Sequence, residues 1–173
     1  MSESVGQQAQ AWPGQTPNGG TIKHGGGHIT VWGCFSASGV GSLKWVKGTM
    51  KAKDYHSILT KRVLPELRKK QKQQPELVWI FQQDQASIHT AHECKDYLQK
   101  RGEEEGFAVL DWPSQSPDLN PIENLWSTLK FQLKNRKKKP RSEAELWKQL
   151  QEKWKNLMAD LLKELADSMP QRC

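Results

Sequence analysis

The chain lacks the features that mark membrane-spanning and disulfide-stabilised secreted proteins. No stretch of its 173 residues approaches the ~20 apolar residues of a membrane span, and the first residues contain no apolar core of a signal peptide. The three cysteines, Cys34, Cys94 and Cys173, lie far apart and form no CxxC pair. An odd number of dispersed cysteines is typical of reduced thiols in an intracellular protein. We therefore expect no membrane association and no disulfide framework.

The chain also contains fewer acidic than basic residues. Nineteen acidic residues stand against 26 basic ones, so the formal net charge is +7 and the pI is about 9.3. This balance favours a polyanionic partner such as DNA, although a solvated basic surface is the alternative. The apolar fraction is only 35%, but eight tryptophans provide large buried areas. The length fits one domain with a core of its own.

The first 27 residues contain a single acidic residue, Glu3, and are rich in Gly, Gln, Ser and Pro. Such a composition predicts a flexible tail over residues 1–27. The domain is expected to follow over residues 28–173.

Within this domain, strand and helix patterns alternate after an initial hairpin. Residues 28–35 and 42–46 are predicted strands joined by a Gly-containing turn. Residues 54–70 have apolar side chains at helical spacing, with Pro65 expected to kink the helix. The short apolar runs 77–81 and 107–110 are typical of strands covered on both faces.

Three further helices are predicted from their capping signals. Thr90 and Glu93 have capping-box spacing before a helix to about Arg101, followed by a solvated loop at residues 103–105. Asn120 and Pro121 are expected as N-cap and first residue of a helix. Ser142 and Glu145 form another capping box, which predicts one final helix carrying a leucine stripe to Leu165. The pattern predicts an α/β fold with a mixed sheet flanked by helices.

Two carboxylates occupy positions suited to metal-dependent chemistry. Asp84 follows the strand 77–81, and ligands in open α/β sheets bind beyond the carboxyl ends of strands. Glu123 lies in the first turn of a later helix. Carboxylates bind Mg²⁺, and a pair of such ions can serve phosphoryl transfer. The alternatives are a turn residue for Asp84 and a helix-capping role for Glu123.

The residues around both acids resemble the catalytic blocks of Tc/mariner transposases. Phe81-Gln82-Gln83-Asp84, with His89-Thr90 shortly after, is similar to the second block. Trp112-Pro-Ser-Gln-Ser-Pro-Asp-Leu-Asn-Pro-Ile-Glu123-Asn-Leu-Trp126 is similar to the third block, whose last acid closes the DDE triad. The resemblance extends from about residue 21 to 166.

The resemblance implies an RNase H-like (integrase-like) fold in which Asp84 and Glu123 are catalytic and metal-binding residues. Mg²⁺ or Mn²⁺ would be the cofactor, and cleavage and joining of transposon-end DNA would be the reaction. His89 and Asn120 are expected as accessory residues, although His89 could be a loop histidine without a catalytic part.

Three departures from the family predict a chain that is inactive alone. The first acid of the triad lies on a central strand before the Gly-rich segment, and no matching acid or strand is found in residues 1–27. We therefore expect the first central strand to be lacking. The segment between Asp84 and Glu123 is longer than usual, and the surplus is expected in a loop at Gly102–Gly106. Residues 85–88 also differ from the family pattern. The alternatives are a non-catalytic DNA- or protein-binding remnant, or a truncated sequence whose missing acid lies upstream.

A basic run at residues 135–141 leads to the C-terminal helix, with residues 137–141 as the linker itself. We expect it to contact DNA phosphates or to act as a nuclear localisation signal, and a solvated hinge is the alternative. A nuclear location, and a homodimer or association with a full-length transposase, complete the expectations. The predicted DNA-binding residues are Lys134, Arg136, Lys137, Lys138, Lys139 and Arg141.

Overall fold

A long antiparallel hairpin forms the centre of the fold. The computed structural model describes residues 22–24, 27–113 and 119–168. Strand β2 (Gly27–Ser36) pairs with β3 (Gly39–Val46), as the sequence predicts, and Gly39 adopts a φ of 136° at the turn. Strand β1 (Ile22–His24) pairs with the beginning of β2. The tail predicted over residues 1–27 is therefore wrong at residues 22–24 and at Gly27, which lie in paired strands.

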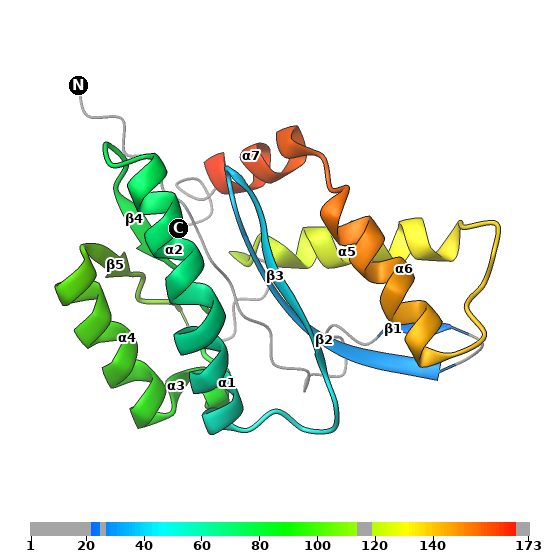
Figure 1. The fold of residues 1–173 in the computed structure, drawn as a ribbon, viewed down its shortest axis with the longest axis horizontal. Coiled ribbons are helices and arrows are strands. Elements are labelled where there is room, and N and C mark those ends of the chain that lie inside the picture. The colour runs from blue at the N-terminus through cyan, green and yellow to red at the C-terminus, as the bar shows by residue number, and fades with distance from the viewer. Residues whose placement is uncertain (1–21, 25–26, 114–118, 169–173) are drawn as a thin grey trace.

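A second, two-stranded sheet lies apart from the hairpin. Strands β4 (Trp79–Phe81) and β5 (Phe107–Val109) pair in parallel, and the bond from Leu110 N–H to the Phe81 carbonyl (2.8 Å) continues the ladder. Among the described residues, β4 pairs with no strand of the β1-β2-β3 sheet. The mixed sheet predicted from the sequence is thus present in two parts (Figure 1).

The predicted helix 54–70 is present as two α-helices joined by a π-helical turn. Helix α1 (Ala52–Ile58) leads into the turn Leu59–Val63, and α2 (Leu64–Gln73) follows. The N–H of Leu64 donates to the carbonyl of Leu59, five residues back. Pro65 has no N–H to donate and its ring crowds the preceding turn. The sequence predicts a kink at Pro65, and the structure has a wider π-helical turn immediately before it.

The helix predicted from Thr90 to about Arg101 differs from the observed structure at both of its ends. Thr90 ends a short helix, α3 (Ser87–Thr90), and α4 (His92–Glu105) begins after Ala91 without a side-chain cap. The predicted loop at residues 103–105 is the last turn of α4, which ends at Gly106 with φ of 72°. Glu105 holds this end in place, because its carboxylate accepts two hydrogen bonds from Arg68 at 2.6 and 2.7 Å.

The C-terminal part consists of three helices instead of the predicted two. They are α5 (Ile122–Lys134), α6 (Glu143–Lys155) and α7 (Ala159–Asp167). The Ser142 hydroxyl accepts a hydrogen bond from Glu145 N–H (3.2 Å), which confirms the predicted cap. The single final helix is wrong, because the chain leaves the helical conformation at Asn156 and turns before α7. This turn allows Trp154 on α6 and Leu162 on α7 to enter the same core.

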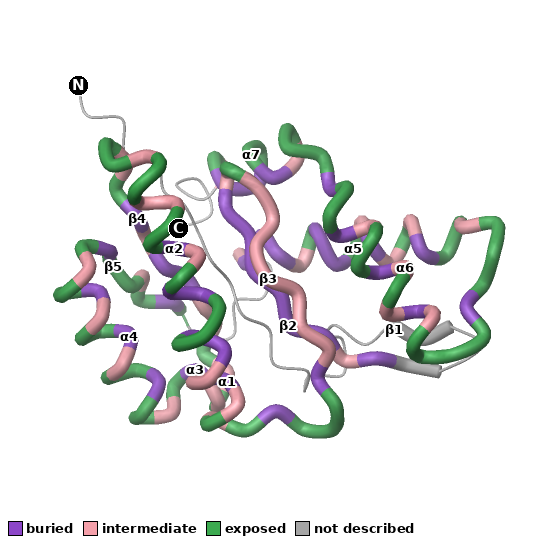
Figure 2. Tube along the Cα trace, viewed as in Figure 1, coloured by how far each residue is buried: buried purple, intermediate pink, exposed green. Residues whose placement is uncertain are grey.

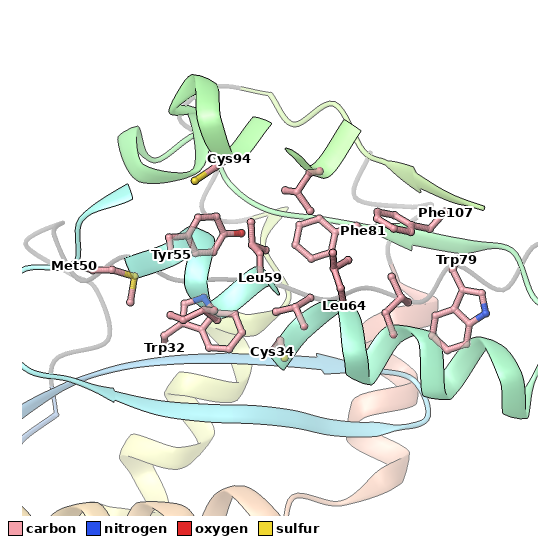
Figure 3. Packing of buried hydrophobic residues seen from close by; sticks show 14 of the residues in the cluster. Trp32, Cys34, Met50, Tyr55, Leu59, Leu64, Trp79, Phe81, Cys94 and Phe107 are labelled. Atoms are coloured by element: carbon pink, nitrogen blue, oxygen red, sulfur yellow. The ribbon is translucent and has the colours of Figure 1, made fainter. Parts of the chain in front are cut away.

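Two apolar cores lie on opposite faces of β2 (Figure 2). Trp32 and Cys34 face the core shared with α1, α2, α4 and the β4-β5 pair, part of which is drawn in Figure 3. Val31 and Phe35 face the core shared with α5, α6 and α7. This alternation has the period of two that a strand requires. Strand β2 is therefore buried on both faces and occupies a central position.

Close packing at Gly33 joins β2 to the C-terminal helices. A Cβ atom at Gly33 would lie 3.0 Å from Trp126 and 3.1 Å from Trp154. These two indole rings stack with their centroids 5.3 Å apart, and Trp154 Nε1 donates to the Gly41 carbonyl at 2.9 Å. Both tryptophans are buried. No helix in the described ranges is long and apolar enough to cross a membrane.

Candidate metal centre at Asp84 and Glu123

The carboxylate of Asp84 is fixed by two groups from the loop that follows β4. Its Oδ1 accepts a hydrogen bond from Ala86 N–H at 3.0 Å and lies 2.6 Å from Nδ1 of His89. The side chain of Asp84 is 22% exposed, whereas that of His89 is entirely buried. The short helix α3 brings His89 back over the strand end. This contact restrains Asp84 while the carboxylate remains partly accessible.

His89 is itself held by an aromatic neighbour that sequence reasoning did not assign to the site. The Tyr55 ring on α1 lies 4.4 Å from the His89 ring, and the Tyr55 hydroxyl donates to Gln83 Oε1 at 2.5 Å. In the sequence Tyr55 fits the apolar face of its helix, and no local signal distinguishes it from a core residue. His89 lies in α3 and its ring packs between Tyr55 and Asp84, so it is not a loop histidine, while its catalytic part stays a prediction.

Glu123 lies in the first turn of α5 with one carboxylate oxygen out of contact with water. Its Oε1 is buried and has no hydrogen-bond partner among the described residues. Burial raises the pKa of Glu123 to about 7, Lys130 opposes this shift, and the charge of Asp84 adds to it. The charge of Asp84 therefore acts on Glu123 in the same direction as burial. The predicted association of Asp84 with Glu123 therefore has electrostatic support, while their placement in a common cleft stays a prediction.

Asn120 shapes the beginning of α5. Its Oδ1 accepts a hydrogen bond from Ile122 N–H at 3.1 Å, and its carbonyl accepts one from Glu123 N–H at 3.1 Å. The side chain is buried, and its Nδ2 has no partner among the described residues. Asn120 therefore holds the backbone of the first turn of α5, which carries Glu123. Residues 114–118 of the Pro-rich motif lie outside the described part of the chain.

The pair of carboxylates suits a divalent cation only in part. A buried carboxylate oxygen without a hydrogen-bond partner, such as Oε1 of Glu123, is stabilised when a cation neutralises its charge. Hard cations such as Mg²⁺ prefer such oxygen ligands. Across the described ranges, however, no group of three or more His, Cys, Asp or Glu side chains is arranged to hold a metal ion. The described residues therefore do not provide the ligands of a two-metal site.

The basic segment after α5 is mostly exposed, with one exception. Five of the six predicted DNA-binding side chains are exposed: Lys134, Lys137, Lys138, Lys139 and Arg141. Arg136 instead donates to the carbonyls of Leu133 and Lys138, the latter at 3.0 Å. Its guanidinium stabilises the end of α5 and the loop itself. The sequence pattern does not reveal this difference, because it depends on how the loop folds back onto the helix.

The fold is that of an RNase H-like transposase catalytic domain. The structure of the Mos1 transposase catalytic domain with raltegravir and Mg superposes with a TM-score of 0.76 at 22% identity, covering 97% of this chain and 79% of that one. The Mos1 mariner paired-end complex with Mn superposes with a TM-score of 0.71 at 20% identity, covering 97% and 53%. At these identities the likeness defines the fold.

Sequence comparisons define the family. The family described as DDE superfamily endonuclease matches residues 2–146. The Tcb1 transposase of Caenorhabditis briggsae is 38% identical over 153 residues, and the Tc1 transposase of Caenorhabditis elegans is 37% identical over 154 residues. In both cases the match covers 88% of this chain and 52% of the relative. The chain belongs to the DDE superfamily of endonucleases and spans about half the length of these curated relatives.

Proposed function

We propose that the chain is a transposase-derived DDE domain for metal-dependent cleavage and joining of DNA in transposition. Two acids carry this proposal: Asp84, which His89 holds at the end of a strand, and Glu123, whose Oε1 is buried without a partner among the described residues. Each lies in the sequence block that resembles a catalytic block of the family. In this reaction water attacks a phosphodiester and frees a 3′-hydroxyl, which then attacks the target strand. The family membership and the Mos1-like fold support the same activity.

Asp84 and Glu123 would hold a Mg²⁺ or Mn²⁺ ion. When bound, such an ion offsets the negative charge that develops on the phosphate during transfer. The chain itself supplies orientation: His89 and Ala86 N–H fix the carboxylate of Asp84, and Asn120 fixes the helix turn that carries Glu123. The Mos1 structures with Mg and with Mn support a divalent cation in this family.

We propose further that the chain alone does not cleave DNA. Two carboxylates leave a second cation without enough ligands, and the described residues bring no third acid into the group. The chain would then act as a non-catalytic DNA- or protein-binding domain, or together with a full-length transposase or a second copy of itself. The exposed lysines after α5 support contact with DNA phosphates, and a nuclear location would agree with this role.

Incubation of the chain with transposon-end DNA and Mn²⁺, the more permissive ion, tests the proposal. The expected result is salt-sensitive DNA binding without cleavage. Cleavage that disappears in both Asp84→Ala and Glu123→Ala would overturn the proposed inactivity and would show that another residue supplies the third acid. Failure to bind DNA at low salt would overturn the DNA-binding role.

A further inference from the structure

A cavity of about 460 Å³ lies at the edge of β3 that faces away from β2, between helices α2 and α6 (Figure 1). Residues 40–43 of β3 line it together with the buried indole of Trp154, and polar side chains of both helices complete its walls. This volume is in the range of small-molecule sites, roughly 300–1,000 Å³. Neither Asp84 nor Glu123 is among the lining residues, so the cavity is separate from the candidate metal centre.

Side chains from both helices bind the backbone of this strand edge. Trp154 Nε1 donates to the Gly41 carbonyl at 2.9 Å, and the Ser42 N–H donates to Glu66 Oε2 at 3.1 Å. The Ser42 hydroxyl donates to the other oxygen of the same carboxylate. A Cβ atom at Gly41 would lie 2.8 Å from Glu66 Oε2, so the glycine allows this close approach. Glu66, the acidic residue among those that line the cavity, is therefore held by β3.

Three lysines give the walls of the cavity an excess of positive charge. They are Lys69 and Lys70 on α2 and Lys155 on α6. The ion pairs within the described residues all involve other basic side chains, so none of the three is paired with a carboxylate there. Lys70 is half-buried, its Nζ donates to Ser36 Oγ, and burial lowers its pKa. An anion among the three ammonium groups would favour their charged form.

Lysines near the C-terminal end of a helix also stabilise the helix itself, and Lys70 and Lys155 lie in the last turns of α2 and α6. This role requires each lysine only at its own helix. It does not require that lysines of two helices line one concave space, where like charges raise the positive potential and attract an anion. The amide groups of Gln73 and Gln151 line the same space and can donate further hydrogen bonds.

We propose that this cavity binds a phosphate group, with Lys69, Lys70 and Lys155 as its ligands. A phosphate monoester carries about two negative charges near neutral pH and offers three strong acceptor oxygens. Lysine binds such groups as a compact point charge, so three ammonium groups around one space suit this ligand. A free phosphorylated molecule and the DNA backbone share this chemistry, and the experiment below separates the two sources.

The test is calorimetric titration of the full chain with inorganic pyrophosphate at low salt and without divalent cations. The wild-type chain is expected to bind it, and Lys70→Gln and Lys155→Gln should each weaken binding by about 10- to 100-fold, because each loses one charge-assisted hydrogen bond. Lys155 is exposed, so its variant keeps the test decisive if Lys70→Gln disturbs folding. The matched control is Lys72→Gln, which removes one charge from an exposed position of α2 outside the cavity and should bind like the wild type.

Three results would overturn the proposal. They are absence of pyrophosphate binding by the wild-type chain, unchanged affinity in Lys155→Gln, and an equal loss in Lys72→Gln, which would show a response to net charge alone. A second titration with a short DNA duplex separates the sources of the phosphate. A greater loss of DNA affinity in Lys155→Gln than in Lys72→Gln assigns the site to the DNA backbone, and equal DNA affinities assign it to a free phosphorylated molecule. None of these measurements involves cleavage or a metal ion, so their outcome is independent of the proposed function.

Discussion

The Nδ1 atom of His89 lies 2.6 Å from Oδ1 of Asp84, and the His89 side chain is completely buried. The strand end alone would leave Asp84 free to rotate, and this contact together with the Ala86 N–H selects one orientation. A histidine that orients a metal-binding carboxylate typically contributes one to two orders of magnitude to metal affinity.

Replacement of His89 is therefore expected to weaken metal binding. In His89→Ala the Mn²⁺ affinity should fall by about 10- to 100-fold, as measured by calorimetric titration at a temperature where circular dichroism shows a native fold. His92→Ala is the matched control, because His92 is 92% exposed and its ion pair is with Asp96 on its own helix. Unchanged Mn²⁺ affinity in a folded His89→Ala protein would contradict an orienting role.

The pH dependence of stability should reflect Glu123. Its pKa is raised from 4.5 to about 7 in the folded chain, so between these values the folded state retains a proton that the unfolded state has released. The free energy of unfolding therefore falls as pH rises from about 4.5 to 7. Its contribution should be on the order of 1 kcal/mol, since one pKa unit corresponds to ~1.4 kcal/mol and partial exposure weakens the effect.

Urea unfolding of the wild-type chain and of Glu123→Gln at pH 5 and pH 8 measures this contribution. The glutamine variant should lose less stability between the two pH values, because the other titrating groups are common to both proteins. Equal losses would show that Glu123 titrates normally in the folded chain.

Substitution of Gly33 should destabilise the junction between β2 and the C-terminal helices. A methyl group there would lie 3.0 Å from Trp126 and 3.1 Å from Trp154, which is closer than ordinary van der Waals contact. Overpacking of this kind costs roughly 1–3 kcal/mol. Thermal unfolding of Gly33→Ala should show a lower midpoint. In the control Gly48→Asn the new side chain meets open space at a left-handed position that asparagine tolerates, and little change is expected.

Two adjacent basic residues should behave differently in DNA binding. Lys137→Ala should weaken binding and reduce the slope of log affinity against log salt by about one, because an exposed lysine that contacts phosphate releases a counterion. Arg136→Ala should lower stability, because the bonds to Leu133 and Lys138 are lost, and leave the salt slope unchanged. Fluorescence anisotropy at several salt concentrations separates the two effects, and an equal fall in both slopes would place Arg136 at the DNA.

Local patterns predicted most of the elements and the main candidates. The alternation of apolar residues in β2, the short apolar runs of β4 and β5, and the cap at Ser142 all correspond to elements of the structure. The errors lie where an element's end depends on distant partners. Helix α4 continues through Glu105 because Arg68 binds that residue, and the final helix divides because α6 and α7 both pack on the hairpin.

The sequence by itself determined the family and the candidate acids, because the motifs around Asp84 and Glu123 are contiguous and specific. Only the tertiary structure decided which side chains support them. Tyr55 and His89 meet through packing of α1 against α3, and the Arg136 guanidinium turns back onto its own helix. The separation of the sheet into two parts is likewise a tertiary property, since strand pairing joins residues distant in the chain and no local pattern specifies the neighbour of a strand.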